Sequence, residues 1–243
     1  MRKVIILQAR LASSRFPQKV LAELGGKTVL AHIIERLKLA TRPDEICVAI
    51  PEDKSENALA DALTGMEVAL TRGSGSDVLG RYIQAAYQTN ADLIVRCTAD
   101  NPLVSPEEID RQLDELVADP ALDYVITDGY PMGVTPESFT LKTLEKLDYL
   151  GKHHNFREHV TLYLRKHPGP FSIKTLAAPS ELTWPDLKLS FDTPRDFELL
   201  KAIYERLYQP GVHLELKRVL NLLKDNPDLA QLGKLPVNQV ASA

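Results

Sequence analysis

The sequence has few of the features that mark secreted, membrane-spanning or nucleic-acid-binding proteins. Two cysteines occur in 243 residues, each inside an apolar run, which excludes a disulfide framework. No apolar run approaches the roughly 18 residues that cross a bilayer. The N-terminal run is broken at Gln8 and Arg10, so we expect no signal peptide and a cytoplasmic location. An excess of positive charge is also missing: 29 basic side chains face 33 acidic ones, which argues against a nucleic-acid polymer as partner.

What the sequence does contain is a regular alternation of buried strands and amphipathic helices. Short runs rich in Val and Ile lack the apolar–polar alternation of half-buried strands and therefore predict strands covered on both faces. These runs are residues 3–8, 45–50, 67–71, 92–98 and 123–127, and helical periodicity covers 28–39, 53–63, 76–88 and a segment from 105 onward. The pattern predicts a three-layer α/β fold, Rossmann-like, with a mostly parallel sheet and helices on both faces.

The alternation lapses over residues 129–180, where Gly, Pro and His are frequent. Within this segment we predict helices over 141–150 and 156–166 and a strand over 171–176. Beyond it we predict a strand over 187–191, a helix from 193 to about 208 and another over 214–224. The chain is thus expected to form one domain, residues 1–243, with an excursion at about 129–180.

The glycine motifs of common nucleotide-binding folds are absent. Gly26-Lys27-Thr28 resembles the end of a Walker A loop, but Leu21 occupies the place of the first glycine. Gly73 and Gly75 could begin a dinucleotide fingerprint, yet Val78 replaces its third glycine, and the loop follows the third strand rather than the first.

The loop after the first strand offers a different phosphate site. Arg10, Arg15 and Lys19 fall within ten residues, with Ser13 and Ser14 between them, and residues 1–30 carry six basic side chains against one acidic. Ligands of open α/β sheets bind outside the carboxyl ends of the strands. Three cations and two hydroxyls at that place suit a triphosphate.

Two aspartates are predicted at the same edge of the sheet. Asp100 follows the strand 92–98, and Asp192 follows the strand predicted over 187–191. Mg²⁺ prefers one or two carboxylates together with phosphate oxygens. The pair therefore predicts a magnesium site beside the basic loop, although aspartates at such places also cap helices and begin turns.

Taken together, these motifs resemble the acylneuraminate and CMP-Kdo cytidylyltransferase family, in particular its spore-coat polysaccharide biosynthesis branch. The resemblance rests on motifs in family order between about residues 3 and 208. They are Ala9-Arg10 with Ser13-Ser14-Arg15, Pro17, Lys19 and Leu21; Gly26-Lys27; Arg72-Gly73-Ser74 with Asp77-Val78-Leu79 and Arg81-Tyr82; Thr98-Ala99-Asp100 with Pro102-Leu103; Arg157-Glu158-His159-Val160-Thr161; and Asp192-Thr193-Pro194 with Asp196.

The resemblance implies a glycosyltransferase-A-like fold and an enzyme that transfers CMP from CTP to a sugar, commonly an acidic one, with release of pyrophosphate. It implies catalytic roles for Arg10, Lys19 and Asp100, and Mg²⁺ held by Asp100 and Asp192. Nucleotide-binding residues would be Ala9, Arg10, Ser13, Arg15, Lys19, Arg72, Ser74 and Asp77. Residues for the acceptor side would be Glu137, Arg157, Glu158 and His159, a region in which the family also often makes a dimer contact. The resemblance therefore implies a homodimer.

The sequence departs from the family at two glycines and leaves other activities open. Ala99 and Gln18 stand where members usually have Gly before the metal aspartate and before the loop lysine, and a Cβ there limits close approach of the backbone to phosphate. The alternatives are a nucleotidyltransferase acting on a non-sugar small acid, a glycosyltransferase of the same fold, and a binding protein without turnover. The glycosyltransferase would normally carry an Asp-x-Asp motif, which the sequence lacks.

Overall fold

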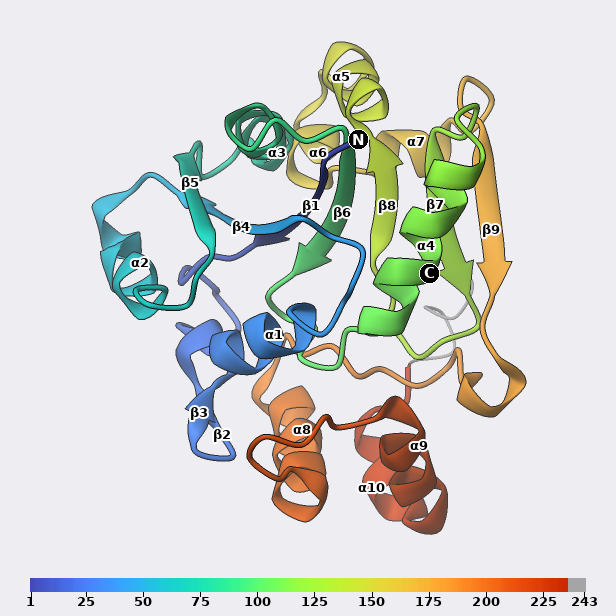
Figure 1. Ribbon diagram of the computed structural model, residues 1–243. Helices are drawn as coiled ribbons and strands as arrows, with labels where there is room; N and C mark the ends of the chain where they lie inside the picture. Colours follow the sequence, from blue (N-terminus) through green and yellow to red (C-terminus); the bar gives the residue numbers. More distant parts are fainter. Residues whose placement is uncertain (236–243) are drawn as a thin grey trace.

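The computed structural model describes residues 1–235 and is built around a seven-stranded sheet (Figure 1). The strands, in the order in which they lie across the sheet, are β5 (Ala69–Gly73), β4 (Glu45–Pro51), β1 (Lys3–Gln8), β6 (Leu93–Thr98), β8 (Glu137–Thr140), β7 (Tyr124–Asp128) and β9 (Ile173–Ala177). All neighbours pair in parallel except β8, which is antiparallel to both β6 and β7. The prediction of a mostly parallel sheet is confirmed.

Helices cover both faces of the sheet, as the alternating pattern predicted. Two separate apolar clusters result. One joins the sheet to α1 (Val29–Leu37), α4 (Pro106–Ala118), α8 (Pro194–Leu207) and α9 (Leu216–Asp225); the other joins it to α3 (Val78–Gln88), α5 (Leu141–Leu150) and α7 (Leu162–Lys166). The remaining helices are the short α2 (Asn57–Ala62), α6 (His154–Glu158) and α10 (Pro227–Leu232). No helix within residues 1–235 has the length and apolar character needed to cross a membrane.

Local sequence explains where the longer helices begin. The side chain of Ser105 accepts a hydrogen bond from the backbone N–H of Glu108, and Pro106 occupies the first helical position of α4. Thr193 and Asp196 form a reciprocal capping box at the start of α8. Because this cap fixes the chain entering α8, it also fixes the residue that precedes it, Asp192.

The segment 129–180 contributes two strands to the sheet. β8 was not predicted, because Phe139 is its one large apolar residue and four residues are too few for a periodic signal. The helix predicted over 156–166 is instead two short helices, α6 and α7, separated by residues 159–161. The final part of the predicted domain, residues 236–243, lies outside the described residues.

The strand predicted over 187–191 is wrong. This segment is extended, but it makes only isolated bridges, between Lys188 and Met132 and between Leu187 and Lys234. It crosses close to Gly133, whose φ of +91° suits glycine, and a Cβ added there would lie 2.6 Å from the backbone nitrogen of Ser190. The apolar side chains of the segment are buried by packing against helices rather than by strand pairing, which a sequence pattern does not distinguish.

Candidate active site

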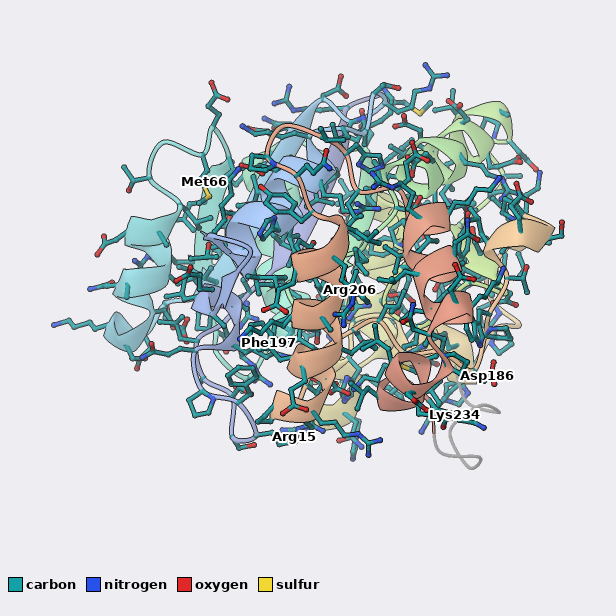
Figure 2. The ribbon with its side chains drawn as sticks, turned by 90° about the horizontal axis from the view of Figure 1, so that it is seen from below. Arg15, Met66, Asp186, Phe197, Arg206 and Lys234 are labelled. Atoms are coloured by element: carbon teal, nitrogen blue, oxygen red, sulfur yellow. The ribbon has the colours of Figure 1, made fainter. Side chains whose placement is uncertain are left out.

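The carboxyl ends of the parallel strands meet at the end of the molecule where α8 begins. In Figure 1 the arrowheads of β6, β7 and β9 point toward the end that carries α8. The loop after β1 reaches the same place and ends in a short 3-10 helix, η1 (Lys19–Leu21). Figure 2 shows Arg15 of this loop and Phe197 of α8 toward the N-terminal end of that helix. The sheet therefore gathers, at one edge, segments that are distant in the sequence.

The loop is fixed at both of its ends. The buried carboxylate of Glu56 accepts the backbone N–H of Leu11 at 2.7 Å, and the N–H of Gln18 donates to the carbonyl of Leu11 at 3.0 Å. Between them, the ring of Phe16 packs against the rings of Phe191 and Phe197, with centroids 6.2 and 5.4 Å away. The basic loop is thus seated on the chain that leads into α8.

Gln18 has a φ of 54° and lies in the left-handed region, where glycine is favoured. The structure therefore accounts for one of the two departures from the family pattern: Gln18 adopts the backbone conformation that a glycine would adopt without strain. Ala99 is buried, and its N–H donates to the carbonyl of Gln8 at 3.0 Å, so its methyl group is accommodated in the core.

Lys19 brings the two predicted metal ligands together. Its Nζ lies 3.0 Å from Asp192 Oδ1 and 3.4 Å from Asp100 Oδ2, and it donates to the carbonyl of Phe191 at 2.8 Å. Only 13% of its side chain is exposed. Asp100 and Asp192 therefore share one ammonium group, although 92 positions separate them in the sequence.

Further basic groups surround Asp192. Arg15 Nη2 lies 3.6 Å from Oδ1, and Lys188 Nζ lies 3.4 Å from Oδ2. Burial would raise the pKa of Asp192, but the positive charges of Lys19, Lys188 and Arg15 outweigh it and hold the pKa below its ordinary value. The carboxylate is consequently ionised, and it is paired with three basic side chains of the protein itself. Sequence reasoning missed Lys188, because it lies inside the segment that was predicted as a buried strand.

Asp100 is oriented by its neighbours at the end of β6. The hydroxyl of Thr98 donates to Asp100 Oδ1 at 2.5 Å, and the side-chain amide of Asn101 donates to the same hydroxyl at 2.9 Å. The backbone N–H of Phe191 donates to the carbonyl of Asp100 at 2.9 Å. This last bond ties the two aspartate-bearing segments directly to each other.

The other residues predicted to bind nucleotide lie near this edge but differ in accessibility. Arg10 is exposed, Ala9 is buried, and Ser13 uses its hydroxyl to accept the N–H of Phe16 at 3.3 Å. Arg72 lies on β5 and is partly exposed. Their contacts with a nucleotide stay predictions.

Ser74 and Asp77 are engaged in the start of α3. Ser74 Oγ accepts the N–H of Asp77 at 3.1 Å, and Asp77 Oδ1 accepts the N–H of Gly80 at 2.8 Å as the helix cap. Asp77 also accepts two bonds from Arg157, from Nε at 2.9 Å and from Nη2 at 2.6 Å. Burial would raise the pKa of Asp77, and the bonds from Arg157 and the helix lower it below its usual value.

The Arg157–Thr161 motif connects α3 to the centre of the sheet. Arg157 binds Asp77 and also donates to Asp148 at 2.5 Å, whereas Thr161 donates to Glu137 at 2.8 Å. His159, between them, is exposed, and Glu158 is partly exposed. Among the four residues predicted for the acceptor side, Arg157 and Glu137 are thus held by other protein groups, while Glu158 and His159 face outward more freely.

Sequence reasoning also missed Arg96, which pairs with Glu137 across β6 and β8. A charged side chain inside the otherwise apolar run of residues 93–98 is unusual for a strand covered on both faces, and this was the signal that could have identified it.

Comparison with known proteins identifies the family of the chain. Residues 4–223 match the family model of the cytidylyltransferases. The chain is 30% identical over 233 residues to the spore coat polysaccharide biosynthesis protein SpsF of Bacillus subtilis, covering 93% of this chain and 96% of that protein. It is 33% identical over 117 residues to the 3-deoxy-manno-octulosonate cytidylyltransferase of Pelobacter propionicus, covering 48% and 45%.

A solved structure of a cytidylyltransferase from Leptospira borgpetersenii is similar over the full fold. The TM-score is 0.88 at 28% identity, and the match covers 97% of this chain and 99% of that one. The basic loop after β1, the two aspartates that meet on Lys19 and the match over residues 4–223 lead to the same assignment: the chain belongs to the cytidylyltransferase family.

Proposed function

We propose that this protein transfers CMP from CTP to a sugar, in particular an acidic one, with release of pyrophosphate, in the synthesis of a surface polysaccharide or glycan. The observation that carries the proposal is the contact of Lys19 with both Asp100 and Asp192, beside the exposed guanidinium groups of Arg10 and Arg15. The site thus combines groups that hold phosphate with carboxylates that hold a cation.

The two carboxylates fit Mg²⁺ as a partner of the triphosphate. Asp100 and Asp192 are only two carboxylates, and within residues 1–235 no group of three or more His, Cys, Asp or Glu side chains is placed to hold a metal ion. Two are sufficient for Mg²⁺, because this ion commonly binds through one or two carboxylates and takes its other ligands from substrate phosphates and water. When bound by Asp100 and Asp192, it would neutralise charge on the reacting phosphate groups.

The chemistry that follows needs positioning more than a protein nucleophile. A hydroxyl of the acceptor attacks the α-phosphorus and gives up its proton to solvent. A new P–O bond forms, and the bond from the α-phosphorus to the bridging oxygen breaks as pyrophosphate leaves. Arg10, Arg15 and Lys19 bind the triphosphate oxygens and stabilise the charge that develops on them. Reactions of this type depend mainly on alignment and on charge stabilisation.

Pyrophosphate release tests the proposal. The protein is incubated with Mg²⁺, each nucleoside triphosphate and a panel of sugar acids, neutral sugars and non-sugar acids. We expect release with CTP and a sugar acid. Consumption of a nucleotide sugar, with no pyrophosphate from any triphosphate, would instead indicate a glycosyltransferase.

The site residues are tested by Asp100→Asn and Asp192→Asn. Each variant should lower kcat at least 100-fold, since one lost electrostatic contact to a transition state costs about that factor. Asp61→Asn, at an exposed position of α2, is the matched control and should retain full activity. Wild-type turnover in either site variant would contradict the metal assignment.

A further inference from the structure

Arg96 and Glu137 form an ion pair at the centre of the sheet. They are register partners on β6 and β8, and Arg96 Nη1 contacts Glu137 Oε2. The side chains are 18% and 10% exposed, respectively. Two charges in so enclosed a place are costly to desolvate, and apolar residues would often serve stability as well. The pair therefore calls for an explanation other than packing.

Glu137 is fully occupied by protein donors. Besides Arg96, it accepts the hydroxyl of Tyr124 at 2.5 Å and the hydroxyl of Thr161 at 2.8 and 3.1 Å from its two oxygens. Burial would raise the pKa of Glu137, but Arg96 and these hydroxyls lower it, so it stays ionised. Its lone pairs are directed at these partners, so Glu137 serves to hold Arg96 rather than to bind an acceptor.

The guanidinium of Arg96, by contrast, is not saturated with hydrogen-bond acceptors. Nη2 lies 3.4 Å from Gln8 Oε1, which is a long contact, and it carries two N–H groups. Nε has no hydrogen-bond partner among the described residues, but it is fully buried, so Nη2 is the group that a ligand oxygen could reach. Arg96 therefore has unused capacity to donate through Nη2.

Arg96 lies between the buried interior of the sheet and its carboxyl edge. Ile94 and Ile6 lie on the same face of the sheet toward its interior and are 0% exposed. Thr98 and Gln8 lie on this face toward the carboxyl edge and are both partly exposed. Since Thr98 donates to Asp100, Arg96 lies one side chain along the strand from the residue that binds the predicted metal ligand.

We propose that Arg96 is the specificity-determining residue that binds the carboxylate of the acceptor, and that Glu137 is the positioning residue that orients it. The proposal rests on the proposed function, since it names the group that selects an acidic acceptor. The planar guanidinium matches a carboxylate through two parallel hydrogen bonds. Arg165 of α7 adds positive charge, being close enough to lower the pKa of Glu137.

Three of the other arginines of this region are less suited to the task. Arg10 and Arg15 belong to the loop assigned to the triphosphate, and Arg157 is already neutralised by Asp77 and Asp148.

The test compares acceptor and nucleotide kinetics in Arg96→Met, Arg96→Lys and Glu137→Gln, with Arg42→Met, at an exposed ion pair with Asp114, as the matched control. Acceptors are 3-deoxy-manno-octulosonate, other sugar acids and the corresponding alcohols in which the carboxylate is reduced. In Arg96→Met we expect the acceptor KM to rise about 10- to 100-fold, the range of a lost hydrogen bond to a charged group. The KM for CTP, and CTP binding by calorimetry, should change less than twofold.

Two comparisons separate recognition from a structural role. With the alcohol in place of the acceptor carboxylate, the acceptor KM of the wild-type protein should rise by the same factor as the Arg96→Met substitution causes. In Arg96→Met the same change of acceptor should leave KM unchanged. Glu137→Gln should raise the acceptor KM in the same direction, and adding it to Arg96→Met should cause no additional rise. The double variant Arg96→Met/Glu137→Gln removes both buried charges, so it can be measured if Arg96→Met alone fails to fold. Arg96→Lys keeps the positive charge but lacks the paired donors of the planar guanidinium.

The outcomes distinguish a failure of the Arg96 assignment from a failure of the proposed function. Unchanged acceptor KM in folded Arg96 variants, or an equal rise in the KM for CTP, overturns the assignment of Arg96 while the proposed function stands. Wild-type protein that binds CTP but uses no sugar acid overturns the proposed function, and this inference with it.

Discussion

The contact of Lys19 with two carboxylates leads to a prediction about divalent cations. The substitution Lys19→Met keeps an unbranched side chain that is one atom shorter and removes the charged ammonium group. Asp100 and Asp192 then lose the ammonium that lies 3.4 and 3.0 Å from them, while Arg15 and Lys188 remain near Asp192. The variant should therefore be less stable than wild type when no other cation is present.

The size of the effect follows from distance and burial. At these separations and an effective dielectric constant of about 20, each Coulomb attraction is on the order of 5 kcal/mol, and desolvation offsets most of it. Removing one partner of a fully buried pair costs about 3–5 kcal/mol. Because both aspartate side chains are 30% exposed, water replaces part of the lost contact. We expect a loss of about 2 kcal/mol, which lowers Tm by about 4–8 °C in a chain of this length.

Thermal unfolding with and without millimolar MgCl₂ is the assay. Mg²⁺ should stabilise Lys19→Met more than wild type, because in wild type the ammonium already lies between the carboxylates that would bind the ion. Lys27→Met removes an exposed pair with Glu35 and is the control, with a loss of at most about 1 kcal/mol and no added response to Mg²⁺. Equal stabilisation of wild type and Lys19→Met by Mg²⁺ would refute the reasoning.

Three further predictions concern the backbone and pH. Gly133→Ala should lower the free energy of unfolding in urea by about 2–4 kcal/mol and lower activity, because the new Cβ would lie 2.6 Å from the backbone nitrogen of Ser190, close to Asp192. Gly169→Ala is the control, since its Cβ meets nothing within 4 Å, and it should lower the free energy of unfolding far less. Gln18→Gly should leave stability within about 1 kcal/mol of wild type, and a clear loss there would show that the left-handed conformation carries no strain. Because folding lowers the pKa of Asp192, the stability that this carboxylate contributes is present above about pH 4 and is lost as the pH falls through the pKa of the folded state. The urea midpoint should therefore fall less steeply between about pH 5 and pH 3 in Asp192→Asn than in wild type.

The strands that form the predicted core were recognisable because burial on both faces leaves a continuous apolar run. The run of residues 3–8 coincides with β1, and the runs at 45–50 and 92–98 differ from β4 and β6 by one residue at one end. β8 could not be predicted in this way, because this antiparallel strand is short and carries the charged Glu137. The burial of Glu137 depends on Arg96, Tyr124 and Thr161, which come from three other segments.

The candidate site was predictable in its residues but not in its contacts. Lys19, Asp100 and Asp192 were singled out from their places near strand ends, and the structure brings them together. The reason given for Asp192 was wrong, since no strand precedes it. The cap of α8 and the crossing at Gly133 place it instead.

The sequence by itself determined the layered α/β fold, the basic loop after the first strand and the family, because local periodicity and motif spacing are encoded in neighbouring residues. Only the tertiary structure decided which charged groups share a partner. It showed that Lys19 joins two aspartates, that Arg157 is held by Asp77, and that Glu137 holds Arg96. The distance between such groups depends on how the whole sheet is assembled, and that distance determines which charges remain free for a ligand.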